Sequence, residues 1–171
     1  ANATGTNTID GNAIDTLTLK DQTAALTTTI TNAKSTALTV NLNNVNTGAS
    51  VVNAGAKAET VTINSNGTKD NTLQFNAAAG KTLNITGDAK LTLVDADVAK
   101  DVVSTNTKGV TITTALGTDV KFTGGTGADS VKLKASFEKA INMGAGDDTV
   151  TYAAASTVEG KVGSVDAGAG K

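Results

Sequence analysis

The 171-residue chain contains no cysteine, histidine, proline or tryptophan, and all of its positive residues are lysine. Without cysteine and histidine it cannot form a disulfide, a Cys-His or Ser-His-Asp catalytic centre, or a zinc site with the usual nitrogen and sulfur ligands. No apolar run approaches the ~18 residues of a membrane-spanning helix, so we expect no membrane insertion. The lack of arginine, histidine and tryptophan also disfavours a polysaccharide-cleaving site, and we expect the chain not to be an enzyme.

Aromatic side chains are almost as scarce, at 2% of the sequence against 39% hydrophobic residues. The core must therefore be built from valine, leucine, isoleucine, alanine and threonine, which suit a narrow stack of strands better than a wide globular interior. The 14 lysines are scattered singly and nearly balance the 16 acidic residues. Without clustered cations and stacking aromatics, we expect no nucleic-acid partner.

Apolar and polar residues alternate with a period of two over most of the chain, the pattern of half-buried β-strands. These units recur roughly every ten residues, for example at Thr16–Leu19, Leu38–Leu42, Val61–Ile63, Leu83–Ile85 and Val110–Ile112. A meander of antiparallel strands would need a tight turn between most neighbours, but the Asn-Gly hairpin signal occurs only once, at Asn66-Gly67. Two stretches with some helical character, 95–103 and 134–140, are interpreted as turns between strands.

The pattern predicts an all-β fold, a parallel β-helix or β-roll solenoid in which each coil of about twenty residues carries two strands. Seven or eight such coils would make a rod roughly 35–40 Å long at ~4.8 Å per coil. We interpret residues 1–171 as a single solenoid segment of a larger protein, with motif-free coils over 1–118 and glycine-rich coils over 119–171. A domain boundary near Gly117 is the alternative. Some asparagines are expected to form structural ladders inside turns: Asn43, Asn44, Asn46, Asn53, Asn64, Asn66 and Asn71.

A nine-residue motif distinguishes the C-terminal third. Residues 124–132 fit the pattern G-G-x-G-x-D-x-U-x at every specified position, and residues 143–151 repeat it with Met143 in place of the first glycine. A third copy begins at residues 167–171. Gly125 and Gly144 are 19 residues apart, and Gly144 and Gly168 are 24 apart, so in a two-strand coil the three turns would stack on one edge.

Such turns offer the ligands that Ca²⁺ prefers. The ion takes six to eight oxygens, many of them backbone carbonyls, and glycine allows the positive φ and the close approach that the turn requires. Two stacked turns, each with two carbonyls and one carboxylate, would supply about six oxygens. Ordinary tight turns in a glycine-rich β-protein are the alternative interpretation. A phosphate loop is less favoured because a strand, not a helix, follows residues 124–127.

The two motifs resemble the nonapeptide repeats of RTX proteins, the calcium-binding β-roll family. The resemblance covers roughly 50 of the 171 residues and implies Ca²⁺ as the cofactor. It implies a first ion site made of Asp129 and Asp148 with carbonyls of the two turns, and a second between the Asp148 turn and residues 168–170. The implied metal-site residues are Gly124, Gly125, Thr126, Gly127, Asp129, Met143, Gly144, Ala145, Gly146, Asp148, Gly168 and Gly170. Unlike a typical family member, the chain has no glycine on the opposite edge from Leu133 to Ala140, so calcium is expected on one edge only.

The composition, rich in threonine, alanine, asparagine, glycine and valine, is similar to that of bacterial surface-layer (S-layer) proteins. Together with the RTX-like turns it resembles the surface-layer proteins that Gram-negative bacteria export by type I secretion. This resemblance implies an extracellular, calcium-stabilised structural protein on the cell surface that assembles with itself. Cell-surface polysaccharide is a further candidate partner. A secreted repeat adhesin that binds glycans or cells is the second hypothesis, and a solenoid enzyme is the third.

Overall fold

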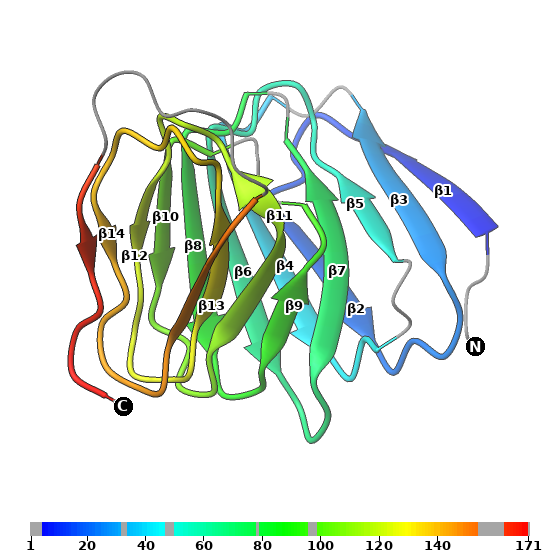
Figure 1. Ribbon diagram of the computed structural model, residues 1–171. Helices are drawn as coiled ribbons and strands as arrows, with labels where there is room; N and C mark the ends of the chain where they lie inside the picture. Colours follow the sequence, from blue (N-terminus) through cyan, green and yellow to red (C-terminus); the bar gives the residue numbers. More distant parts are fainter. Residues whose placement is uncertain are drawn as a thin grey trace.

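The computed structural model describes residues 5–31, 34–46, 50–77, 79–95, 99–153 and 163–170. Within these ranges the chain forms sixteen β-strands, and none of it forms a helix long and apolar enough to cross a membrane. The strands belong to two parallel sheets of eight that face each other (Figure 1). Consecutive strands lie in opposite sheets, so the chain winds as a solenoid with one strand of each sheet per coil.

The first sheet contains the odd-numbered strands in chain order. They are β1 (Gly5–Asp10), β3 (Leu26–Thr31), β5 (Val51–Asn53), β7 (Asn71–Asn76), β9 (Leu91–Leu93), β11 (Val110–Leu116), β13 (Ser130–Leu133) and β15 (Thr149–Tyr152). The second sheet contains the even-numbered strands. They are β2 (Thr16–Lys20), β4 (Ala37–Asn43), β6 (Thr60–Asn66), β8 (Thr82–Gly87), β10 (Asp101–Ser104), β12 (Lys121–Thr123), β14 (Ile141–Asn142) and β16 (Val165–Asp166).

The register between strands gives the length of each coil. In the first half, Thr16 pairs with Thr39, 23 residues further along, and in the second half Ser130 pairs with Thr149, 19 residues further along. The predicted all-β parallel solenoid of two-strand coils is therefore confirmed. The hairpin signal at Asn66-Gly67 is explained differently, because this pair leads from β6 in one sheet to β7 in the other.

Of the two stretches predicted to be turns, 134–140 is confirmed as the connection between β13 and β14. In the other stretch, 101–103 belong to β10, while 96–98 lie outside the described residues.

The core is a set of apolar ladders between the two sheets. One rung from each of six coils of the even-numbered sheet forms a buried row: Leu38, Val61, Leu83, Val102, Phe122 and Ile141. Alternation within each strand sends these residues inward and their neighbours outward. In β7, for example, buried and half-buried positions alternate over all six residues. Each fully buried residue of this size contributes about 1.5–3 kcal/mol relative to exposure, so the rod is stabilised coil by coil.

On the outer faces of the two sheets, asparagine side chains connect successive coils. On the even-numbered sheet, Asn41 Nδ2 donates to Thr18 Oγ1 at 3.4 Å and Asn64 Nδ2 donates to Asn41 Oδ1 at 2.7 Å. The odd-numbered sheet has a similar ladder formed by Thr29, Asn53 and Asn76. The prediction of asparagine ladders inside turns is therefore wrong for Asn53 and Asn64, which lie in strands and point outward.

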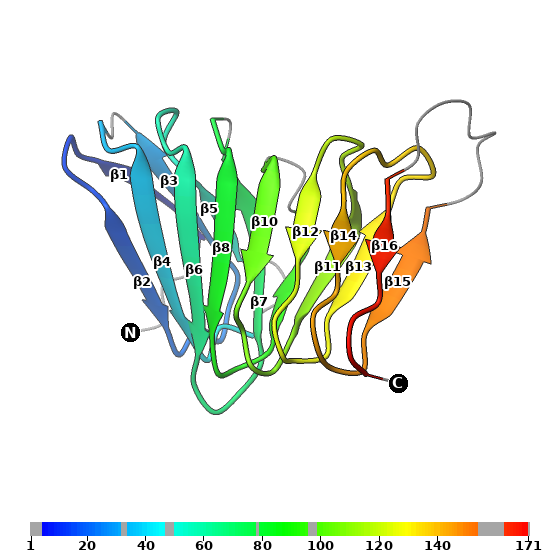
Figure 2. The same ribbon diagram turned by 90° about the vertical axis from the view of Figure 1, so that its left-hand side faces the viewer.

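The turns form two edges along the rod. The turns that lead from an even-numbered strand to the next odd-numbered strand make up the lower edge of Figures 1 and 2, and we call this the lower edge. The turns that lead from odd to even strands form the upper edge. All residues predicted to bind metal lie at or next to the lower edge, so the fold collects them on one side.

Candidate functional site

The glycine-rich motifs occupy the last turns of the lower edge. Residues 124–129 lead from β12 to β13, residues 143–148 lead from β14 to β15, and residues 167–170 follow β16. Backbone hydrogen bonds join these turns: Ala145 N donates to the carbonyl oxygen of Gly125 at 2.8 Å, and Ala169 N donates to that of Gly144 at 2.9 Å. The predicted stacking of the three turns on one edge is therefore confirmed.

Glycine is required at Gly144 and Gly168 for two physical reasons. Their φ angles are +85° and +71°, in the region that side chains rarely adopt. A Cβ atom on Gly144 would lie 2.3 Å from the carbonyl oxygen of Gly125, and one on Gly168 would lie 1.7 Å from that of Gly144. The turns are thus packed backbone against backbone, which brings their carbonyl oxygens close together.

The side chain of Asp129 connects two coils and is buried, at only 1% exposure. Its Oδ1 accepts a hydrogen bond from Val110 N of the preceding coil at 2.7 Å, and its Oδ2 accepts one from Gly125 N of its own turn at 3.2 Å. Burial raises the pKa of the Asp129 carboxyl; the two backbone N–H groups oppose this rise, and the nearby Asp148 adds to it.

Asp148 holds the equivalent position one coil later but is bonded differently. Its Oδ1 accepts a hydrogen bond from Asp129 N at 2.8 Å, so the two aspartates are stacked. Its Oδ2 is buried and has no hydrogen-bond partner among the described residues. The reason is local: Gly144 N, the counterpart of Gly125 N, donates instead to Asn142 Oδ1 at 2.9 Å.

The other predicted residues contribute to the turns in different ways. Gly127 and Gly146 lie in the stack, where a Cβ atom on Gly127 would be 2.1 Å from Gly109 N and one on Gly146 would be 2.7 Å from the carbonyl oxygen of Gly127. Thr126 has an exposed side chain and takes part only through its backbone. The side chain of Met143 is completely buried, which explains why methionine stands where the motif has glycine: its side chain fills core space and its carbonyl stays in the turn.

The remaining members, Gly124, Ala145, Gly168 and Gly170, also lie in the stacked turns. A Cβ atom on Gly124 would lie 2.1 Å from the carbonyl oxygen of Met143, and one on Gly170 would lie 1.8 Å from that of Gly146. Ala145 pairs with Ala169 in an isolated parallel bridge. The structure therefore brings all twelve predicted residues into one row of turns.

The donor set fits Ca²⁺ in chemistry, because it consists of carboxylate and backbone carbonyl oxygens. Asp148 Oδ2 is the atom that fits best, since a buried carboxylate oxygen without a partner is costly and a cation would compensate for it. Asp129 fits less well, because both of its oxygens already accept backbone hydrogen bonds. Among the described residues there is no group of three or more acidic side chains that could hold a metal ion, so any ion here must rely on carbonyl oxygens.

Three side chains of this edge were missed by sequence reasoning. Asn142 and Asp166 each accept a hydrogen bond from the backbone N–H two residues on, at 2.9 Å in both cases. This is an Asx turn, and an asparagine or aspartate two residues before a turn glycine is the signal that could have revealed it. The third is Asn106, completely buried, whose Oδ1 accepts a hydrogen bond from Lys108 N at 2.8 Å.

Comparison with known proteins adds no identification. No family model and no curated protein sequence matches this chain. The function is therefore argued from the geometry of the turns and from the surface of the rod.

Proposed function

We propose that this chain is a structural segment of a bacterial surface layer, exported to the cell surface, stabilised there by Ca²⁺ and assembled with other copies of itself. The observation that carries the proposal is the stack of glycine turns in which Asp148 Oδ2 is buried without a partner among the described residues. A stacked Gly/Asp turn that leaves one carboxylate oxygen unsatisfied is an arrangement that a hard cation would complete.

Asp148 and the turn carbonyls would hold the ion, and Asp129 would support it by fixing the backbone of its own turn. The ion would supply positive charge beside the buried Asp129 and the half-buried Asp148, whose mutual repulsion contributes to the raised pKa of Asp129. Binding to the folded form alone stabilises that form by RT ln(1 + [Ca²⁺]/Kd), about 2.7 kcal/mol at one hundred times Kd. In the low calcium of a cytosol the last coils would be loose, which suits export in an unfolded state.

The outer faces of the rod suit assembly with other copies. They carry regular rows of polar side chains in which the same residue type recurs in successive coils, as in the row Thr16, Thr39 and Thr62. A repeated surface can make the same contact many times, and many weak contacts together give strong association. Lateral packing through these threonine and asparagine faces is the proposed basis of the layer.

Calcium titration of the chelated protein, followed by circular dichroism and thermal unfolding, tests the ion site. We expect calcium to raise the unfolding midpoint of the wild-type chain. Asp148→Ala should abolish this rise, and Asp129→Ala should lower the midpoint even without calcium because it removes two backbone hydrogen bonds. The matched control is Asp88→Ala, an exposed aspartate of the same edge outside the motif, which should respond to calcium like the wild type.

A midpoint that ignores calcium in the wild-type chain would refute the ion site. Assembly is tested separately by electron microscopy, where the proposal expects ordered sheets with calcium and their dispersal by chelator. A soluble rod that forms no sheets but binds glycans or cells would favour the second candidate, a repeat adhesin. A polar groove on the lower edge would serve an adhesin as well as a surface-layer protein, so sheet formation is the result that separates the two candidates.

A further inference from the structure

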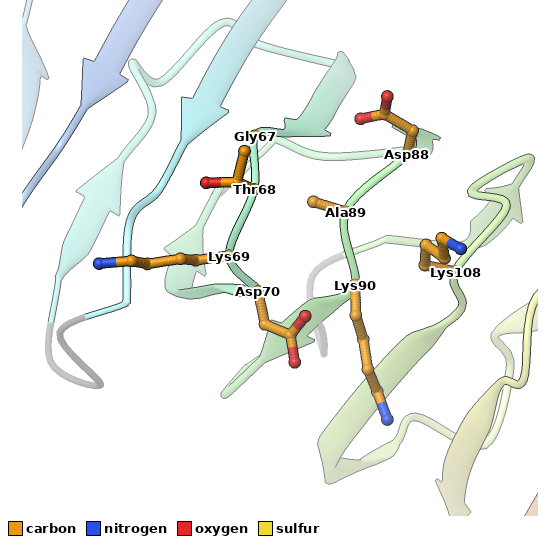
Figure 3. Close-up of a pocket in the computed structure, with 8 residues that line it drawn as sticks. All are labelled: Gly67, Thr68, Lys69, Asp70, Asp88, Ala89, Lys90 and Lys108. Carbon is orange, nitrogen blue, oxygen red and sulfur yellow. The ribbon is translucent and has the colours of Figure 1, made fainter.

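A shallow hollow of about 410 Å³ lies on the lower edge, N-terminal to the glycine motifs (Figure 3). Turns of three successive coils form it, and each turn contributes one lysine: Lys69, Lys90 and Lys108. Asp70 and Asp88 lie among them. None of its described lining residues is aromatic, so its binding chemistry is that of charges and hydrogen bonds.

A second hollow of about 340 Å³ continues along the same edge toward the N-terminus. Lys69 lines both, and Figure 3 shows its side chain pointing away from Asp70 and Lys90. The second hollow adds the carboxylate of Asp21 and uncharged donors and acceptors from Gln22 and Asn46. Together the two hollows make a polar groove that follows the turns of five coils, roughly 20 Å at ~4.8 Å per coil.

Hydrogen bonds between coils hold part of this groove in shape. Asn44 Oδ1 accepts bonds from Thr68 N at 3.0 Å and Lys69 N at 3.2 Å, and Asn44 Nδ2 donates to Asp21 Oδ1 at 2.8 Å. Asn44 itself has a φ of +57°, so the turn is fixed by these bonds in a conformation that asparagine tolerates. A preformed groove loses less entropy on binding than a loose one.

The lysines of the groove differ from two lysines of the upper edge that form ion pairs. At the upper edge, Lys81 forms an ion pair with Glu59 of the preceding coil at 2.9 Å, and Lys100 forms one with Asp119 of the next coil. In the groove, no ion pair within the described residues involves the three lysines, although aspartates are near. Asp70 and Lys90 lie in adjacent turns, joined by the bond from Asn71 N to the carbonyl oxygen of Lys90 at 2.9 Å. Their side chains extend in the same direction in Figure 3.

We infer that this groove binds a linear acidic polysaccharide. One unpaired ammonium group per coil, repeated over three coils, matches a polymer that carries carboxylates at a regular spacing. The aspartates and amides between the lysines would accept and donate hydrogen bonds to sugar hydroxyls. Single-stranded nucleic acid is disfavoured because it is held by aromatic stacking as well as by charge, and the lining offers no ring.

The inference deepens the proposed function, because it rests on that function only for placing the chain beside cell-surface polysaccharide. The groove and the calcium turns are separate in the sequence, at residues 21–108 and 124–170. Failure of one can therefore be told from failure of the other. Lysine variants should keep the calcium response, and Asp148→Ala should keep polysaccharide binding.

Calorimetry of the full chain with short oligogalacturonates tests the inference, with neutral maltodextrins of the same length as the reference ligand. We expect oligogalacturonate to bind and maltodextrin not to bind. The variant Lys69→Gln, Lys90→Gln, Lys108→Gln should bind about tenfold more weakly or worse, and its affinity should depend less steeply on salt because fewer ionic contacts remain.

The matched control removes the same charge elsewhere, at three exposed lysines outside the groove: Lys57→Gln, Lys121→Gln, Lys139→Gln. Its affinity for oligogalacturonate should equal that of the wild type. Three outcomes would overturn the inference: no binding of oligogalacturonate, an equal loss in the two triple variants, or equally tight binding of single-stranded DNA and polyphosphate. The last outcome would mean that charge alone is recognised.

Discussion

Two aspartates that occupy the same motif position have different roles at the residue scale. Asp129 has both oxygens satisfied by backbone N–H groups, whereas Asp148 has one satisfied and one buried without a partner among the described residues. The difference comes from Asn142, which accepts the bond from Gly144 N. At the corresponding place in the first motif stands Thr123, so Gly125 N remains for Asp129. One residue outside the motif therefore decides which carboxylate is open to a cation.

The raised pKa of Asp129 predicts a pH dependence of stability in calcium-free protein. Its folded pKa lies above its unfolded one, so between the two values the folded state binds more protons and the free energy of unfolding falls as pH rises. Asp129→Asn cannot titrate. The unfolding free energy of the wild type minus that of Asp129→Asn should therefore fall as pH rises above the ordinary aspartate pKa of about 4, measured by urea unfolding with chelator.

Asp119 provides a control of opposite sign. Its hydrogen bond with Lys100 lowers the pKa of the Asp119 carboxyl, so its contribution is present above the unfolded pKa and is lost as pH falls through the folded one. The difference between wild type and Asp119→Asn should grow with pH and stay small, because both side chains are exposed. A difference for Asp129→Asn that does not change with pH would contradict the interpretation.

Replacement of Gly144 by alanine should lower stability for two reasons, the backbone conformation of the residue and the lack of space for a side chain. The positive φ alone disfavours alanine by about 1–2 kcal/mol, and the new Cβ would meet the carbonyl oxygen of Gly125 at 2.3 Å. We expect Gly144→Ala to lower the free energy of unfolding by about 2 kcal/mol or more, measured by urea unfolding. Gly5→Ala is the control, because Gly5 has a φ of +108° but no atom within 4 Å of the added Cβ. Equal losses in the two variants would mean that backbone stacking of the turns contributes nothing.

The glycines and aspartates of the motif could be found from the sequence because their spacing matches one coil. The bonding of each aspartate could not, because it depends on Asn142 and Val110, which lie outside the motif turns. A repeated pattern predicts which residues stack. It does not predict which backbone donors remain free once neighbouring side chains have taken theirs.

At the scale of the elements, the aspartates belong to a longer series of polar side chains that face the lower edge from inside. Asn71, completely buried, accepts a bond from Val45 N at 2.6 Å. Asp129 likewise accepts a bond from Val110 N of the preceding coil, whereas Asn106 accepts one from Lys108 N two residues on in its own turn. Each of these acceptors satisfies a backbone N–H at the lower edge.

The choice between amide and carboxylate follows from the turn itself. Asn71 Nδ2 donates to Ser65 Oγ at 2.9 Å and to the carbonyl oxygen of Asn66 at 3.0 Å. This corner therefore offers hydrogen-bond acceptors to the amide nitrogen of the side chain. At Asp129 the corner offers a donor instead, Gly125 N. An amide therefore suits the longer N-terminal turns, and a carboxylate suits the glycine turns.

This reasoning predicts that Asn71→Asp is strongly destabilising. The substitution would place a carboxylate oxygen against the carbonyl oxygen of Asn66 in a buried corner, at a cost of about 3 kcal/mol. Urea unfolding at neutral pH measures the loss, which should shrink in acid as the new carboxyl is protonated. Asn7→Asp, an exposed position of β1, is the matched control and should change stability by less than about 0.5 kcal/mol. The same loss in both variants would disprove the assignment.

Most strands could be predicted from the sequence, because most inward positions, such as Val61, Ile63, Leu83 and Ile85, are apolar. The shortest elements, β14 and β16, have two residues each. Two residues show too little alternation for the ends of a strand to be predicted. The buried position of Asn106 could not be predicted for another reason. In a chain so rich in asparagine, nothing local distinguishes a buried corner amide from a surface one.

At the scale of the whole molecule, burial is uneven along the rod. Strands β4 and β6 in the first half alternate between buried and half-buried or exposed positions over seven residues, whereas β15 is mostly exposed and β16 entirely so. Among the residues that the structure describes, the two exposed large apolar side chains are Tyr152 and Val165 of these last strands, at 56% and 39% exposure. Strand β1 at the other end is also mostly exposed. A solenoid in which each coil contacts only its neighbours can open from its ends, so the end coils are expected to be less stable than the middle ones.

Hydrogen exchange followed by mass spectrometry tests this gradient and its link to calcium. In chelated protein, amides of β15 should exchange faster than those of β6 and β8, because β15 is mostly exposed whereas β6 and β8 alternate with buried positions. Calcium should slow exchange between residues 124 and 149 and leave β6 unchanged, since a local ion stabilises mainly the coils that it joins. Asp148→Ala should remove the calcium effect while preserving the gradient. Uniform protection along the rod, or a calcium effect that reaches β6, would instead show that all coils unfold as one unit.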